Sequence, residues 1–114
     1  MSVSDTQYPD EPICLEVIFH IKEGHTGQFL QELQAVIELV VIEPQCLDFC
    51  VFQDPENLNR VRVTETWTSR KFLEEVQMKK HYYVPYFTKV EPMWSHPLQM
   101  QFWRPRSAFR RVTA

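Results

Sequence analysis

Side chains in the middle of the chain alternate between two faces, more strictly apolar and polar over 60–67 than over 47–52, which is the period of a β-strand. The pattern predicts a hairpin made of a strand at 47–52, a turn at 54–59 and a second strand at 60–67. On the second strand, Glu65 points to the same side as Val63 and Trp67. This carboxylate among apolar neighbours is the most informative chemical feature of the sequence.

The rest of the pattern predicts further strands and helices. They are a strand at 13–22, a helix at 26–42, a helix at 70–78 capped by Ser69, a short helix with Pro85 in its first turn, and a strand at 98–103. The resulting order, β-α-β-β-α-β, is typical of an α+β fold of the ferredoxin-like, split βαβ type. We therefore expect one four-stranded antiparallel sheet with helices on one face.

The second face of this sheet carries bulky apolar residues that no predicted helix covers. They are Ile18, Cys50, Phe52 and Trp103. An exposed patch of this kind is costly on a monomer, and a second copy of the same sheet would cover it. We therefore expect a homodimer in which two sheets face each other and form a barrel.

Composition narrows the class of protein. The 114 residues make one domain, 13–104, between an acidic arm at 1–12, expected to be flexible, and a basic tail at 105–114. A net charge of −3 gives no case for nucleic acid or membrane as a partner. Three cysteines, an odd number, and the lack of a signal peptide predict reduced thiols in the cytoplasm. No zinc-site spacing and no flavin or nicotinamide motif occurs, so we expect neither metal nor cofactor.

The central hairpin also resembles a known family. The residues that carry the resemblance are Pro44-x-Cys46, Gln53-Asp54 and Glu65-x-Trp67-x-Ser69. They resemble the antibiotic biosynthesis monooxygenase family, and the resemblance extends over roughly residues 13–104. It implies a dimeric α+β barrel and oxygenation without a cofactor. His81 matches a family position near the pocket, whereas Val63 and Val76 stand where members often carry polar groups.

These observations select candidate site residues. Glu65, Trp67 and His81 are the predicted catalytic residues, with Glu65 as a general base whose pKa burial would raise. The predicted substrate-binding residues are Phe19, Phe29, Val63, Tyr83 and Tyr86. Each has a structural alternative: packing for the aromatic and aliphatic residues, a neutralised carboxylate for Glu65, and a solvated surface position for His81.

Three functions remain open. The first, implied by the resemblance, is monooxygenation of an aromatic, polyketide-like substrate of the anthrone or quinol type, with O₂ as the second reactant. The second is cyclisation, isomerisation or decarboxylation in the same pocket by acid–base chemistry. The third is binding without catalysis, which is favoured if a structural partner neutralises Glu65 and if Phe19, Phe29 and Trp67 fill the cavity.

Overall fold

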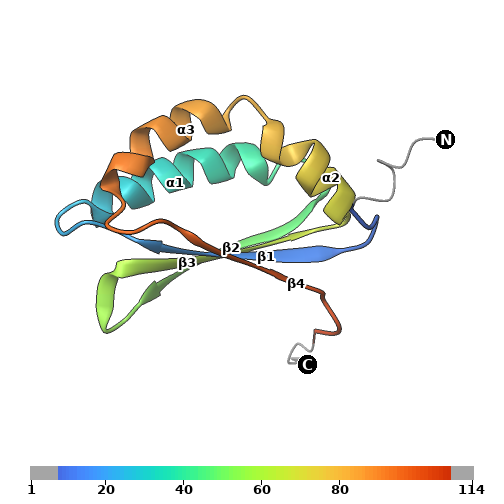
Figure 1. Ribbon diagram of the computed structural model, residues 1–114, viewed down its shortest axis with the longest axis horizontal. Coiled ribbons are helices and arrows are strands. Elements are labelled where there is room, and N and C mark those ends of the chain that lie inside the picture. The colour runs from blue at the N-terminus through green and yellow to red at the C-terminus, as the bar shows by residue number, and fades with distance from the viewer. Residues whose placement is uncertain (1–7, 109–114) are drawn as a thin grey trace, which may run out of the picture.

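The computed structural model describes residues 8–108 and has two layers, a four-stranded antiparallel sheet and helices that cover one of its faces (Figure 1). The elements are β1 (Ile13–His20), α1 (Thr26–Val40), β2 (Cys46–Asp54), β3 (Asn57–Trp67), α2 (Arg70–Glu75), α3 (Tyr83–Val90) and β4 (Gln99–Trp103), with 3₁₀ helices at Gln77–Lys79 and Glu91–Met93. The predicted α+β fold is confirmed.

The strand order in the sheet is β2-β3-β1-β4, and every pair is antiparallel. β1 is central and pairs with β3 on one side and β4 on the other. This is the ferredoxin-like topology that the predicted order of elements implies. The two strands that flank β1 in the sheet, β3 and β4, therefore come from distant parts of the chain.

The β2–β3 hairpin is tighter than predicted. β2 continues to Asp54 and β3 begins at Asn57, so only Pro55 and Glu56 form the turn. The Asp54 carboxylate accepts a hydrogen bond from the backbone N–H of Glu56 at 2.9 Å, and proline fixes one backbone dihedral. The turn-forming residues 57–59, predicted to be loop, instead extend β3 to 11 residues.

The core lies between the sheet and the helices. α1 contributes Phe29, Leu33, Val36 and Val40 to it, all buried. The helix ends at Val40, two residues earlier than predicted, and Ile42 beyond it is 76% exposed. The apolar face of α1 thus runs to its last residue, and the β-branched residues after it leave the core.

The second helical segment is shorter than the predicted helix at 70–78 and buries a different residue at its end. Ser69 caps α2 as predicted, because its hydroxyl accepts a hydrogen bond from the backbone N–H of Phe72 at 3.0 Å. α2 ends after Glu75, however, and the chain continues as a 3₁₀ turn. A regular helix over 70–78 would place Val76 inward with Phe72 and Leu73, but Val76 is 45% exposed and the neighbouring Gln77 is buried in its place. A tighter turn changes the direction of each following side chain.

The other face of the sheet is not covered by any element that the structure describes (Figure 1). Phe52 and Trp103 on it are 47% and 54% exposed. Glu16 and Arg62 form an ion pair on the same face. The dimer expected from this face stays a prediction.

The two ends of the described chain contact the folded domain. Residues 8–12 run beside the start of α2, where the Ser69 hydroxyl donates to Asp10 at 2.6 Å and the backbone N–H of Arg70 donates to Glu11 at 2.7 Å. Arg104 lies 3.0 Å from the Glu11 carboxylate. The remainder of the predicted arm and tail, residues 1–7 and 109–114, lies outside the described residues.

Candidate active site

A cavity of about 160 Å³ lies between the helices and the covered face of the sheet. Its walls are mainly aliphatic and aromatic, with Leu15, Val17 and Val63 on the sheet and Val36, Val40 and Leu73 on the helices. Three polar side chains reach it, which are Glu65, Tyr83 and Tyr86. An apolar cleft with a few polar groups is the usual form of a small-molecule site.

Glu65 is held in this cavity by β3. In the sheet it pairs with Leu15 of β1 and Phe49 of β2, and paired residues point to the same face. The Glu65 side chain therefore points toward the helices, as those of Leu15 and Phe49 do. Only 9% of the residue is exposed. Burial raises the pKa of the Glu65 carboxyl group to about 7, although a hydrogen bond from Trp67 acts in the opposite direction. Glu65 can therefore take up or release a proton near neutral pH.

Trp67 lies beside the cavity and not in its lining. It is fully buried, which agrees with the packing alternative for this residue. Its indole N–H donates a hydrogen bond to Glu65 Oε1 at 2.8 Å, because both side chains leave β3 on the same face. Trp67 thus fixes one oxygen of the carboxylate and leaves the other without a partner among residues 8–108.

Tyr83 and Tyr86 bring two phenol groups from α3, one turn apart. Burial raises the pKa of both hydroxyls above the ordinary value, so both remain protonated at neutral pH. The Tyr83 oxygen accepts a hydrogen bond from the Gln77 amide at 3.0 Å. The Tyr86 hydroxyl is buried and has no hydrogen-bond partner among the described residues. Both can donate to an oxygen atom of a bound molecule.

The other predicted site residues divide into two groups. Phe19 and Val63 line the cavity. Phe29 does not, since it is fully buried behind Phe19, with their ring centroids 5.0 Å apart. His81 is exposed in the turn before α3 and also lies outside the cavity lining. The cavity therefore brings together five of the eight predicted residues and leaves out Phe29, Trp67 and His81.

Sequence reasoning missed several residues of the site. Phe49, Met78 and Met100 line the cavity. Gln77 does not line it but donates a hydrogen bond to Tyr83, which does. Phe49 could have been found, because it alternates with Asp48 and Cys50 and so belongs to the helix-facing side of β2. Gln77 could not, because its inward direction depends on the 3₁₀ turn after α2.

Two absences hold for residues 8–108. No group of three or more His, Cys, Asp or Glu side chains there is arranged to hold a metal ion. In the same part of the chain, no helix has both the length and the apolar character needed to cross a membrane.

Comparison with known proteins gives a consistent result. The chain is 21% identical over 96 residues, 83% of its own length and 80% of the other's, to a Pestalotiopsis microspora protein that carries the provisional name of a monooxygenase. A mutant of SnoaB, a cofactor-independent oxygenase from Streptomyces nogalater, matches with a TM-score of 0.77 and 10% identity, covering 89% of this chain and 99% of that one. A conserved protein from Methanosarcina mazei Go1 matches with a TM-score of 0.77 and 18% identity, covering 84% and 94%.

At these identities the solved structures show a shared fold. The profile of the antibiotic biosynthesis monooxygenase family matches residues 12–82, which is more than half of the chain and includes Glu65 and Trp67. The chain therefore belongs to the antibiotic biosynthesis monooxygenase family.

Proposed function

We propose that the protein is a cofactor-independent monooxygenase that oxidises a small aromatic phenol or quinol, with Glu65 as its general base. One observation carries this proposal: the Glu65 carboxyl group is buried in the wall of an apolar cavity and has a pKa of about 7. A general base is most effective when its pKa lies near the working pH. SnoaB, which has the same fold, is a cofactor-independent oxygenase.

The proposed reaction begins with proton transfer from the phenol or enol of the substrate to the Glu65 carboxylate. The electron pair moves into the ring, and a ring carbon that carries hydrogen gives electrons to O₂ and binds it as a peroxide. Glu65 returns its proton to the peroxide, the O–O bond breaks, and the ring carbon releases its hydrogen as a proton, which combines with the departing hydroxide. The ring carbon becomes a carbonyl, one oxygen atom stays in the product, and the other leaves as water.

The remaining groups support these steps. The hydroxyl groups of Tyr83 and Tyr86 can donate to oxygen atoms on which negative charge develops. The aliphatic walls keep bulk water away from the anionic substrate. The substrate itself is the reductant, so the protein needs only to bind, deprotonate and shield it.

The size of the cavity limits the substrate. An apolar protein cavity of about 150 Å³ can hold benzene, and sites for drug-sized ligands start at about 300 Å³. At about 160 Å³, this cavity fits one ring or two fused rings. A tricyclic substrate such as an anthrone requires movement of Met78 and Met100, which line the cavity, are 38% and 44% exposed and have flexible side chains.

Oxygen uptake tests the proposal directly. 1-Naphthol and anthrone should each consume one O₂ and yield the corresponding quinone and water, with the smaller substrate turning over faster. Labelled O₂ should leave one labelled oxygen atom in the product, as measured by mass spectrometry. No uptake above the protein-free background with either compound would contradict the proposal.

An acid–base isomerase or cyclase is the second candidate. The Glu65 carboxyl group and the two protonated tyrosines also suit a reaction that moves protons without O₂. Assays without oxygen separate the two candidates, because full turnover under anaerobic conditions excludes the oxygenase. The non-catalytic candidate has less support, since Glu65 has no cationic partner among residues 8–108 and the aromatic residues leave the cavity open.

We also propose that the uncovered face of the sheet binds a second copy of the chain. Phe52, Trp103 and the half-buried Ile18 form its apolar part. Burial of each large side chain contributes roughly 1.5–3 kcal/mol, and a two-fold axis lets one patch cover its own copy.

A further inference from the structure

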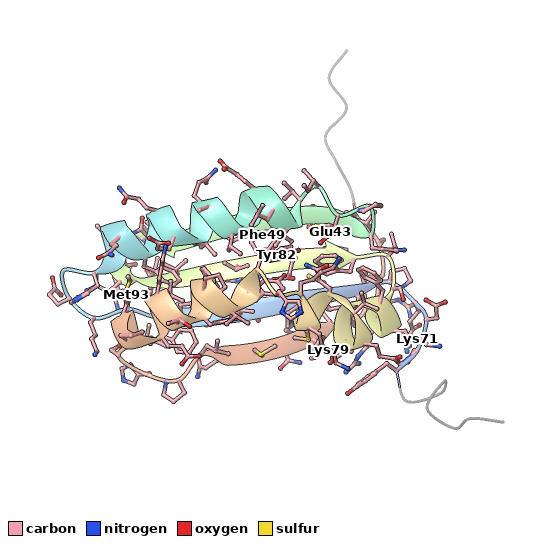
Figure 2. All side chains as sticks on the ribbon, turned by 90° about the horizontal axis from the view of Figure 1, so that it is seen from above. Glu43, Phe49, Lys71, Lys79, Tyr82 and Met93 are labelled. Atoms are coloured by element: carbon pink, nitrogen blue, oxygen red, sulfur yellow. The ribbon has the colours of Figure 1, made fainter. Side chains whose placement is uncertain are left out.

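A chain of hydrogen bonds connects the cavity to the surface. Gln77 is fully buried, and its amide Nε2 donates to the Tyr82 oxygen at 2.6 Å and to the Tyr83 oxygen at 3.0 Å. The Tyr82 hydroxyl donates to Glu43 Oε2 at 2.7 Å, and Lys80 Nζ lies 3.4 Å from the same oxygen. Glu43 and Tyr82 lie near each other where the end of α1 approaches the segment before α3 (Figure 2).

The hydrogen positions in this chain follow from Glu43. Glu43 forms an ion pair with Lys80, and the carboxylate of such a pair only accepts hydrogen bonds. Tyr82 must therefore use its single hydrogen on Glu43. Its oxygen can then only accept, so Gln77 must present its N–H₂ group to it. This fixes the orientation of the amide, which atomic positions by themselves rarely do.

The orientation of Gln77 determines what Tyr83 can do. With one N–H of Gln77 on each tyrosine, the Tyr83 oxygen is an acceptor of that amide. The Tyr83 hydrogen then has no acceptor among residues 8–108, and Tyr83 lines the cavity. The Gln77 carbonyl oxygen is buried without a partner. An unpaired buried oxygen is destabilising, but the opposite orientation would place this oxygen against the Tyr82 oxygen, whose hydrogen is used on Glu43, and would leave the buried N–H₂ group unpaired.

We propose that Gln77 is a positioning residue, which occupies the Tyr83 oxygen with an N–H donor and so leaves the Tyr83 hydrogen to a ligand oxygen in the cavity. The inference rests on the proposed function in that the ligand occupies the cavity of Glu65. It adds a requirement for that ligand, namely a carbonyl or oxyanion on the flat apolar ring system in addition to the group that meets Glu65.

Two bicyclic probes of nearly equal shape test this without turnover. α-Tetralone carries one carbonyl acceptor, and tetralin carries none. Calorimetric titration of the protein with each gives a ratio of dissociation constants that reports the hydrogen bond to the carbonyl. A single neutral hydrogen bond corresponds to about 5–10-fold in this ratio. We expect Tyr83→Phe to reduce the ratio by that factor, and Gln77→Met to reduce it in part because the Tyr83 hydroxyl is no longer oriented, while tetralin binding stays constant.

Glu43 offers a remote variant that keeps the cavity wall intact. In Glu43→Gln the new amide can donate to Tyr82, so the Tyr82 hydrogen can turn to Gln77 and the Gln77 carbonyl can then accept from both tyrosines. The ratio should fall about 5–10-fold, although Glu43 does not line the cavity. Glu32→Gln is the matched control, because Glu32 is also on the α1 side and pairs with a lysine, Lys89, at 3.6 Å, but contacts neither tyrosine.

The outcomes separate the two proposals. A fall in the ratio for Gln77→Met and Glu43→Gln, with Glu32→Gln unchanged, supports the positioning role even if no substrate is ever oxidised. An unchanged ratio in folded Glu43→Gln would overturn it, and so would equal losses of tetralone and tetralin binding in Gln77→Met, which indicate a structural role only. Neither result affects the proposed role of Glu65 in oxygen uptake, which is tested separately by the oxygen-uptake assay.

Discussion

The two faces of the sheet shift the pKa of a glutamate in opposite directions. Glu65 points from β3 to the helices and is buried, and its pKa is raised to about 7 by loss of hydration. Glu16 points from the neighbouring β1 to the uncovered face, and its pKa is lowered, first by its hydrogen bond with Arg62. Glu65 has an indole N–H as its hydrogen-bond partner, whereas Glu16 has the Arg62 cation as well as the Trp103 indole N–H.

The difference shows what sets the role of a carboxylate in this fold. The strand period decides the face, and the face decides whether the proton or the charge is favoured. Glu16 remains ionised and serves an ion pair at the surface. Glu65 exchanges its proton near neutral pH, which a general base requires.

The largest expected effect is a difference in oxygen uptake between two variants in which one of these glutamates is replaced by glutamine. In Glu65→Gln, oxygen uptake with 1-naphthol should fall by roughly 10²–10⁴-fold, the usual contribution of a general base. Glu16→Gln should retain its turnover, because Glu16 does not line the cavity. Circular dichroism checks that both variants are folded. Uptake by Glu65→Gln within tenfold of the unchanged protein would exclude Glu65 as the base.

The pH dependence of stability should reveal Glu65 next. Its pKa is about 7 in the folded chain and about 4.3 when unfolded, so the folded state holds more protons between these values. Stability from this group is present below the unfolded pKa and is lost as pH rises through about 7. The loss is roughly 4 kcal/mol. Urea unfolding of the wild type from pH 4.5 to 8 should show it.

Glu65→Gln provides the control for this measurement, because glutamine does not titrate. The free energy of unfolding of the variant should lack the downward component seen in the wild type. Parallel pH profiles for the two proteins would show that the folded Glu65 has an ordinary pKa.

A charge on the uncovered face should disrupt the dimer. In Trp103→Glu a carboxylate replaces an indole near Glu16, and its burial between two sheets without a partner is unfavourable. We expect the dimer dissociation constant to rise by roughly 10–100-fold. Light scattering at micromolar concentration measures it, and Ile42→Glu, at an exposed apolar position after α1, is the matched control. A folded wild type that is already monomeric would contradict the dimer.

Removal of the Tyr86 hydroxyl should give the smallest effect, with opposite signs for stability and function. The hydroxyl is buried without a hydrogen-bond partner among residues 8–108, so Tyr86→Phe should stabilise the fold by about 1 kcal/mol. If the hydroxyl donates to the substrate, turnover should fall several-fold in the same variant. Thermal unfolding and oxygen uptake measure the two effects. A loss of stability would show that the hydroxyl is paired in solution.

The sequence predicted the side-chain directions that follow from a regular strand or helix period. It did not predict the directions that depend on a break in that period. The strict alternation of β3 was enough to direct Glu65, Val63 and Trp67 to one face, and Ser69 marked the start of α2 by its capping chemistry. The indole–carboxylate bond needed side-chain positions that period does not give. Gln77 depends on the early end of α2, where the turn tightens and brings it inward instead of Val76.

The position of β4 has a consequence for the order in which the protein folds. β2 and β3 are joined by two turn residues and can pair early, because closure of a short loop costs little entropy. β1 can pair with β3 at that stage, but its other edge must wait for β4, which comes from the opposite end of the folded chain. Leu98 and Met100, before and within β4, form part of the cavity wall. A chain that emerges from the ribosome can therefore build the hairpin that carries Glu65 well before it can enclose a ligand.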